Sequence, residues 1–363
     1  MPTGPRNREM VRLGLVLFFA VLSACGALPG PLHAQVTINA DPMSSALGEA
    51  TVALSGRAGV ILYNPASIGE EPGVLRVATN VGWPLVVRNK WIAGEQVGTK
   101  MAISSQSIEY SLTRWRFAGA SRLLEIGKPE DVPPEVAEIA ESAYLLSSMV
   151  GGSYQISSRL RVGGAAKYHA RHAAGIQTTT LAIDLGLQHN WTVNTNQIEL
   201  VPSVGWSLTD FGRPFSIDGI SLPLQSMMRL GAAITGATRK AVDGRTLVGF
   251  AIVGALSKNV SAGDNERRLE FVDGPLESLF SSFHGNLELG THWGLEITML
   301  EFLSVRTGYY HEPTAISNLQ YQSFGFGVRL NFIAIEWSKI PSDQHPLLGG
   351  QQFWRIVGRI PIR

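Results

Sequence analysis

The sequence TTLAIDLGLQHNW, residues 179–191, alternates strictly between apolar and polar side chains. The apolar set is Leu181, Ile183, Leu185, Leu187 and Trp191, and the polar set is Thr180, Asp184, Gln188 and Asn190. A period of two is that of an extended strand, whose successive side chains point to opposite faces. A length of ~10 residues is what a tilted strand needs to cross a bilayer. The stretch therefore predicts a strand with one apolar and one polar face.

The same alternation recurs along the chain. In residues 285–297 the apolar set is Leu287, Leu289, Trp293, Leu295 and Ile297, and the polar set is Asn286, Glu288, His292 and Glu296. Residues 159–169, 323–331 and 332–337 follow the same pattern, and weaker segments begin near Val74, Val150, Ile198, Arg229, Leu247 and Gln351. Repeated amphipathic strands of this length predict an all-β protein.

Two architectures have such strands, and the composition separates them. In a soluble sandwich the apolar face is the core, whereas in a transmembrane barrel it meets lipid and the polar face lines the lumen. Charged residues make up only 16% of the chain, against ~25% in a typical soluble domain. Aromatic residues near strand ends suit the girdles of a barrel: Tyr168, Trp191, Trp206, Tyr309 and Trp337. We therefore expect a transmembrane antiparallel β-barrel.

The length of the chain limits the number of strands, and the residue types within the strands indicate which face lines the lumen. The residues after the N-terminal region allow about 12 to 16 strands at ~10 residues each. Glycines within the strands suit a crowded or plugged lumen: Gly163, Gly164, Gly186, Gly290, Gly325 and Gly327. The polar side chains expected to face the lumen are Asp184, Gln188, Glu288, His292 and Glu296.

The N-terminus has the pattern of an export signal. Arg6, Arg8 and Arg12 precede an apolar run, 13–28, that is shorter than the ~20 residues of a spanning helix. Cleavage after Ala34 would define a signal peptide at 1–34. Leu22-Ser23-Ala24-Cys25 also fits a lipoprotein cleavage box, with Cys25 as the lipidated residue. Either cut predicts an exported chain, and a Gram-negative outer membrane is the expected location.

Some segments lack the alternation. Residues 129–147, with Val136, Ile139 and Ala143 at helical spacing, and residues 275–283 are candidate short loop helices. They belong to long insertions at 119–147 and 257–284. Residues 35–72, rich in Ala, Ser and Gly, precede the expected barrel at 73–363. We expect 41–69 to form a plug inside the lumen; a periplasmic extension is the alternative.

The expected plug carries the most specific motif of the chain. It comprises Ala46-Leu47-Gly48-Glu49-Ala50, Val52-Ala53 and Tyr63-Asn64-Pro65-Ala66-Ser67-Ile68. Here the chain resembles the PorV/PorQ family of FadL-like outer-membrane barrels, although Glu49 and Ser67 stand where glycine is usual. The resemblance implies a barrel of about fourteen strands with an N-terminal segment folded into the lumen. Plug residues expected from it are Gly48, Ala50, Asn64, Pro65 and Ala66.

No pattern of a catalytic site, cofactor site or metal site stands out in the sequence. His169 and His172 fall on opposite faces of an extended strand, and Glu288 and Glu296 lie too far apart along one strand for a single metal shell. We therefore expect no enzyme, no cofactor and, at a net charge of +1, no nucleic-acid partner.

Two functions remain open. The family resemblance implies an interaction component of type IX protein secretion, with secreted cargo or secretion components as partners. The alternative is a FadL-like channel for hydrophobic small molecules. Outer-membrane lipid is a partner in both.

Overall fold

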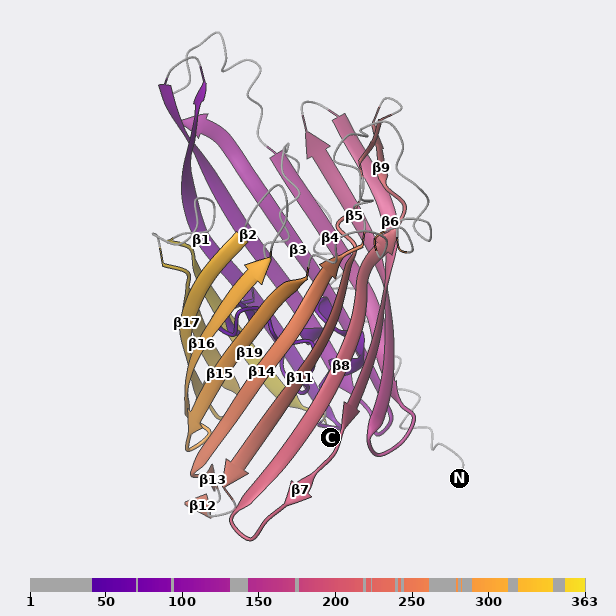
Figure 1. Ribbon diagram of the computed structural model, residues 1–363, viewed down its shortest axis with the longest axis vertical. Helices are drawn as coiled ribbons and strands as arrows, with labels where there is room; N and C mark the ends of the chain where they lie inside the picture. The colour runs from indigo at the N-terminus through magenta and orange to yellow at the C-terminus, as the bar shows by residue number, and fades with distance from the viewer. Residues whose placement is uncertain are drawn as a thin grey trace.

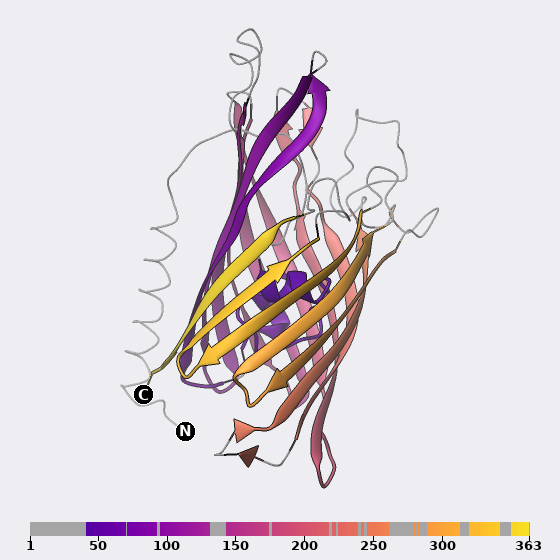
Figure 2. The ribbon, with the colours of Figure 1, turned by 90° about the vertical axis from the view of Figure 1, so that its left-hand side faces the viewer.

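The chain forms a closed antiparallel β-barrel of fourteen strands, which confirms the expected fold class and strand number. The computed structural model (Figures 1 and 2) describes residues 41–69, 71–92, 95–130, 143–173, 176–217, 220–222, 224–238, 241–242, 245–260, 279, 282, 289–312, 319–341 and 350–362. Neighbouring strands of the wall follow one another in the sequence, and β1 closes the wall by pairing with β19.

The strands of the wall vary in length from 7 to 19 residues. They are β1 (Val74–Ile92), β2 (Glu95–Ser111), β3 (Trp115–Glu130), β4 (Ala143–Gln155), β5 (Leu160–Ala173), β6 (Ile176–Asn190), β8 (Ile198–Gly212), β11 (Met227–Thr238), β14 (Val248–Asn259), β15 (Gly290–Met299), β16 (Leu303–Glu312), β17 (Leu319–Leu330), β18 (Ile333–Lys339) and β19 (Gln352–Pro361). Short strands extend the hairpins: β7 (Val193–Asn194), β9 (Phe215–Ile217), β10 (Ile220–Leu222), β12 (Ala241–Val242) and β13 (Arg245–Thr246).

The two faces of the wall differ as the alternation predicts. On β6 the outward Leu185 and Leu187 are 42% and 43% exposed, whereas the intervening inward residues are buried. On β15 to β19, aromatic side chains gather on the outward face, and the Trp293–Tyr309 and Trp337–Trp354 ring centroids lie 6.2 and 6.3 Å apart. An apolar outer wall with aromatic residues is typical of a barrel that spans a membrane.

The segment 41–69 lies inside the barrel, as the indigo coil in Figures 1 and 2 shows. It contains three single-turn helices, α2 (Pro42–Ala46), η1 (Val60–Leu62) and η2 (Pro65–Ser67). Helix α2 contacts β16 to β19, and η2 contacts β4 to β6, so the segment bridges opposite sides of the wall. Its apolar side chains are almost all buried.

The insertion expected from the sequence at 119–147 is wrong, because β3 runs through Glu130 and β4 starts at Ala143. Residues 129–130 and 143–147 are strand, so a helix over the whole of 129–147 is also wrong. The outward faces of β2 and β3 carry Ser104, Gln106 and Ser121, and these polar residues hide the alternation.

Other expectations fall outside the described residues. These are the signal peptide at 1–34 with Cys25, most of the loop-helix candidate at 275–283, and Glu288. Of 275–283, only Leu279, which is helical, and Ser282 are described, and the Ser282 hydroxyl donates to the Leu279 carbonyl at 2.8 Å. In the part of the chain that the structure describes, none of the helices has the length and apolar character needed to span a membrane.

Candidate functional site: the interface of plug and barrel

We call the segment 41–69 the plug. The N-terminal half of the plug starts with a capped helix. The Asp41 carboxylate accepts a hydrogen bond from the Ser44 amide at 3.1 Å, and Pro42 occupies the first helical position. Both features favour a helix start. The chain then turns through Gly48 and Glu49, whose φ angles are 61° and 60°. Glycine tolerates this left-handed conformation best, and here Glu49 adopts it.

The C-terminal half of the plug is built around Asn64. Its side-chain oxygen accepts from the Ala66 amide at 2.9 Å and caps η2, which begins at Pro65. Its side-chain nitrogen donates to the Val52 carbonyl at 2.8 Å and to the Leu187 carbonyl of β6 at 3.1 Å. One buried side chain therefore ties together η2, the middle of the plug and the wall.

Glycines of the inner wall let the plug approach the strand backbones. A Cβ atom at Gly163 would overlap the backbone of Pro65 and Ala66, and one at Gly308 would overlap Leu47 and Gly48. Seven inward glycines on seven strands abut the plug in this way: Gly163, Gly186, Gly205, Gly231, Gly294, Gly308 and Gly325. The wall is therefore shaped around the plug.

Polar side chains of the wall satisfy the plug backbone. The Gln188 amide and the Ser203 hydroxyl both donate to the Ala53 carbonyl at 2.8 Å. The Ser323 hydroxyl donates to the Ser45 carbonyl at 2.5 Å. Buried backbone groups of an irregular segment need such partners, because an unpaired one costs free energy.

One sector of the inner wall is apolar. On β11 and β14, small apolar side chains face inward and contact apolar side chains of the plug. The cluster consists of Ala233, Ala251, Val253 and Ala255 of the wall and Met43, Leu47, Ala50, Val52, Ala53 and Leu54 of the plug. The plug therefore covers an apolar strip of the lumen.

The adjoining sector, on β15 to β19, is charged. Glu296 pairs with Arg306 at 2.5 Å, and Arg306 pairs with Glu336 at 3.0 Å. Glu336 also accepts from Arg355 at 2.5 Å. These four buried wall residues form a row of alternating charge across β15, β16, β18 and β19, which we call the charge ladder.

The plug joins the charge ladder at both ends. Arg57 pairs with Glu296, and Asp41 pairs with Arg355. The Arg355 guanidinium also donates to the Ala58 carbonyl at 2.9 Å, so a single wall arginine holds residues 41 and 58 together. A buried charge is tolerated only when it is paired. Because positive and negative side chains alternate along the charge ladder, each of its four residues, and Arg57 and Asp41 at its ends, has a partner of opposite sign.

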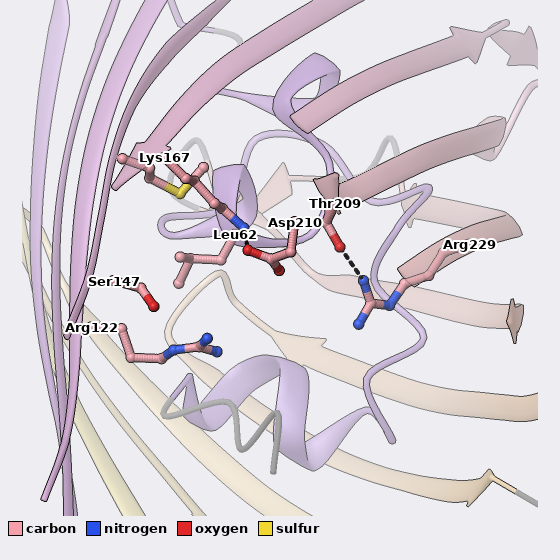
Figure 3. Close-up of a pocket in the computed structure, with 8 residues that line it drawn as sticks. Leu62, Arg122, Ser147, Lys167, Thr209, Asp210 and Arg229 are labelled. Atoms are coloured by element: carbon pink, nitrogen blue, oxygen red, sulfur yellow. Dashed lines mark hydrogen bonds and ion pairs between the residues drawn. The ribbon is translucent and has the colours of Figure 1, made fainter. Parts of the chain in front are cut away.

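A small cavity lies between the plug and β3 to β11 (Figure 3). It measures about 10 Å³, which is room for about one water molecule. Its lining consists of Leu62, Arg122, Ser147, Met149, Lys167, Thr209, Asp210 and Arg229. The Arg229 guanidinium donates to the Thr209 hydroxyl at 3.1 Å and lies 5.9 Å from the centre of the Tyr63 ring.

Beside the cavity lies a buried ion cluster of the wall. The Lys167 ammonium lies 2.9 Å from both Asp184 and Asp210. His169 lies 3.0 Å from Asp210, and Ser147 lies 2.8 Å from His169. Asp210 has a φ of 57° at a register shift between β6 and β8, so the wall is irregular here. Because Lys167 already compensates Asp210, we interpret the cluster as structural.

The structure places the polar residues expected at the lumen as follows. Asp184, Gln188, His292 and Glu296 are buried on the inner face, and each contacts the plug or another wall residue. Asp184 and Glu296 therefore belong to ion clusters rather than to a water-filled surface. His172, on the other face of β5 from His169, lies 5.8 Å from the Tyr144 ring. Among the described residues, no group of three His, Cys, Asp or Glu side chains could hold a metal ion.

The arginines of the charge ladder were not among the residues expected at the lumen. Arg306 and Arg355 lie on the inward faces of β16 and β19, and each follows an outward apolar residue, Val305 or Trp354, which was a usable signal. Their partners lie on other strands or in the plug, up to 314 positions away in the sequence. The pairs could not be assigned before the strand order was known.

Comparison with known proteins gives similarity at the level of the fold. No protein-family model matches, and no curated protein matches. Among solved structures, a mutant of the monoaromatic hydrocarbon channel TodX has a TM-score of 0.47 at 12% identity, over 88% of this chain and 97% of that one. The toluene transporter TbuX of Ralstonia pickettii has a TM-score of 0.47 at 11% identity, over 89% and 98%. A FadL homologue of Pseudomonas aeruginosa has a TM-score of 0.47 at 8% identity, over 93% and 99%.

Proposed function

We propose that the protein is an outer-membrane channel for small hydrophobic molecules and that the plug, residues 41–69, closes it in the described state. In this proposal, the leader at 1–34 directs export. The observation that carries the proposal is the apolar strip of β11 and β14. A water-filled pore has a polar lumen, whereas this lumen has Ala233, Ala251 and Val253 facing inward under the plug.

The contacts of the plug with the inner wall are non-covalent, so the plug can leave the lumen without breaking a covalent bond. The plug is joined to the wall by hydrogen bonds, ion pairs and apolar contacts, and its covalent link to the wall is at β1. Displacement of residues 41–54 would uncover the apolar strip and open a path beside it. The cavity beside the plug in Figure 3, of about 10 Å³, is too small for a solute other than water, so passage of a larger solute through this part of the lumen requires such a displacement.

The role in type IX secretion has less support. Besides the family resemblance, its argument from the sequence used the insertions at 119–147 and 257–284, and the described residues of the first range are all strand. We therefore favour the channel. Because TodX is described as a monoaromatic hydrocarbon channel and TbuX as a toluene transporter, toluene is a convenient first probe.

A reversible cross-link tests the proposal. Ser45→Cys combined with Ser323→Cys, in a chain with Cys25→Ala, would join α2 to β17, where the two residues are already in contact. We expect oxidation to lower toluene uptake by intact cells to the level of cells without the protein, and reduction to restore it. Ser323→Cys alone is the matched control.

Unchanged uptake after quantitative formation of the disulfide would refute a moving plug. Loss of surface proteins in a deletion strain, with toluene uptake unaffected, would favour the secretion role instead.

A further inference from the structure

Two neighbouring turns at one end of the barrel are apolar. They are 300–302, between β15 and β16, and 331–332, between β17 and β18, and both lie at the lower end in Figure 1. The Arg329 amide donates to the Phe302 carbonyl at 2.8 Å, which joins the two turns. Six apolar side chains at these turns are between 40% and 61% exposed, and we call them the apolar rim: Met299, Leu300, Phe302, Leu330, Phe332 and Ile333.

The lengths of the connections assign this end of the barrel to the periplasm. At the end with the apolar rim, β15 and β16 are joined by 300–302, whereas at the other end β14 and β15 are joined by 260–289. Transmembrane barrels have short periplasmic turns and longer extracellular loops. The apolar rim is therefore at the periplasmic edge of the membrane.

The apolar rim continues the lipid-facing wall without interruption. On β15 the outward side chains before Met299 are Leu295 and Ile297, and on β18 the outward side chain after Ile333 is Ile335. All of these side chains are apolar and exposed. The surface that meets lipid thus extends down both strands as far as the turns.

The turns of β2 to β5 end differently. Trp115 of β3 and Tyr154 of β4 point outward at the start and end of their strands, with ring centroids 4.6 Å apart. Aromatic residues of this kind mark the boundary between membrane and water. Beyond them the turns carry exposed arginines, Arg114 and Arg159. In the apolar rim, by contrast, aromatic residues lie in the turns themselves.

The backbone of the turn 300–302 gives a second argument. Leu300 and Glu301 have φ angles of 51° and 55°, a left-handed conformation that hairpin turns usually assign to Gly, Asn or Asp. A contact of the Leu300 side chain with lipid would offset the strain, whereas exposure of the side chain to water would add to it. The Glu301 carboxylate accepts from the Thr246 amide at 3.1 Å, so the charged residue of this turn has a partner within the protein.

We infer that the apolar rim is immersed in the periplasmic leaflet of the membrane and is covered by lipid. Its continuity with the lipid-facing wall selects lipid as the occupant, because lipid already covers the side chains directly above it. The turns of β2 to β5 remain in water, so the membrane boundary is not at the same distance from every turn. This inference uses the membrane location in the proposed function, but neither transport nor a moving plug.

Spin labels at single cysteines test the inference in the purified full-length protein. The labelled variants are Phe332→Cys and, as a second site of the apolar rim, Phe302→Cys, each in a chain with Cys25→Ala. The matched control is Ser158→Cys, in the exposed turn between β4 and β5. In vesicles of phosphatidylethanolamine and phosphatidylglycerol, dissolved oxygen should relax both rim labels more than a water-soluble nickel chelate does. The order should be reversed at Ser158→Cys.

The other outcomes each overturn the inference and name a different occupant. Stronger relaxation of the rim labels by the nickel chelate would place the apolar rim in water, free for a soluble partner. Protection from both reagents that is lost when the protein is diluted with lipid would assign it to a second copy. Protection at every dilution would mean that the chain covers its own rim. None of these outcomes changes the expected effect of the plug cross-link on toluene uptake, so the two proposals fail separately.

Discussion

Adjacent residues on a strand of this barrel face opposite surroundings. Asp184 is fully buried beside Lys167, whereas Leu185 is 42% exposed on the lipid side. Gly163 touches the plug backbone, whereas a Cβ at Gly164 would meet only the Asp184 carbonyl, at 3.7 Å. Such neighbours provide matched pairs of substitutions, because they share a strand and differ in what they contact.

The first prediction concerns the lipid face. Leu185→Arg should lower the free energy of unfolding by ~2–4 kcal/mol if the residue lies near the bilayer midplane. Urea titration of the protein in lipid vesicles measures this value. As a second measurement, cysteine labelling from the lipid phase should reach Leu185→Cys; labelling of Asp184→Cys in its place would show that the faces are reversed.

The second prediction compares two neighbouring glycines. Gly163→Ala would place a methyl group against Pro65 and Ala66, and overpacking of this kind costs ~1–3 kcal/mol. We expect the plug to loosen and to become accessible to protease added from the periplasmic side. Gly164→Ala should change neither stability nor cleavage, and equal effects of the two substitutions would contradict the close contact of plug and β5.

At the scale of elements, the sequence predicted those strands whose outward faces are uniformly apolar. Strands β6 and β15 have clear alternation, and a weaker segment was expected to begin near Gln351, where β19 starts at Gln352. Strands β2 and β3 were missed because polar residues interrupt their outward faces, Ser104 and Gln106 on β2 and Ser121 on β3. The charge ladder could not be predicted, because its pairs depend on strand order and on where the plug sits.

The third prediction concerns η2. Asn64→Ala together with Pro65→Ala should loosen the plug by ~1–2 kcal/mol without removing any strand, because the cap of η2 and the bond to Leu187 are lost. Hydrogen exchange of the plug amides should rise, while exchange of the wall amides should stay unchanged. Faster exchange throughout the wall would mean that Asn64 supports the barrel itself.

The fourth prediction concerns the charge ladder. Arg355→Met should destabilise the protein by ~3–5 kcal/mol, because it leaves Asp41 and Glu336 buried with fewer opposite charges. Arg359→Met, which removes a more exposed pair with Glu71, should cost only ~0–1 kcal/mol. Similar losses for the two variants, measured by urea titration, would show that the charge ladder does not hold the plug.

At the scale of the whole molecule, the inner face of the barrel is complementary in shape and charge to one segment of its own chain. Inward glycines on seven strands, an apolar strip on β11 and β14 and the charge ladder on β15 to β19 all meet residues 41–69. The closed wall depends mainly on alternation, which is visible in the sequence. The fit of the plug depends on contacts between distant residues, which only the folded chain brings together.

The central claim is that residues 41–69 close the lumen, and the conductance of single proteins in planar bilayers tests it most directly. Deletion of 41–69 should leave an inserted barrel, because the described wall strands lie outside this segment. The account predicts a larger and less selective conductance for the deletion variant than for the intact chain. An inserted deletion variant with the conductance of the intact chain would contradict the claim, and 41–69 would then have to be interpreted as a docking segment.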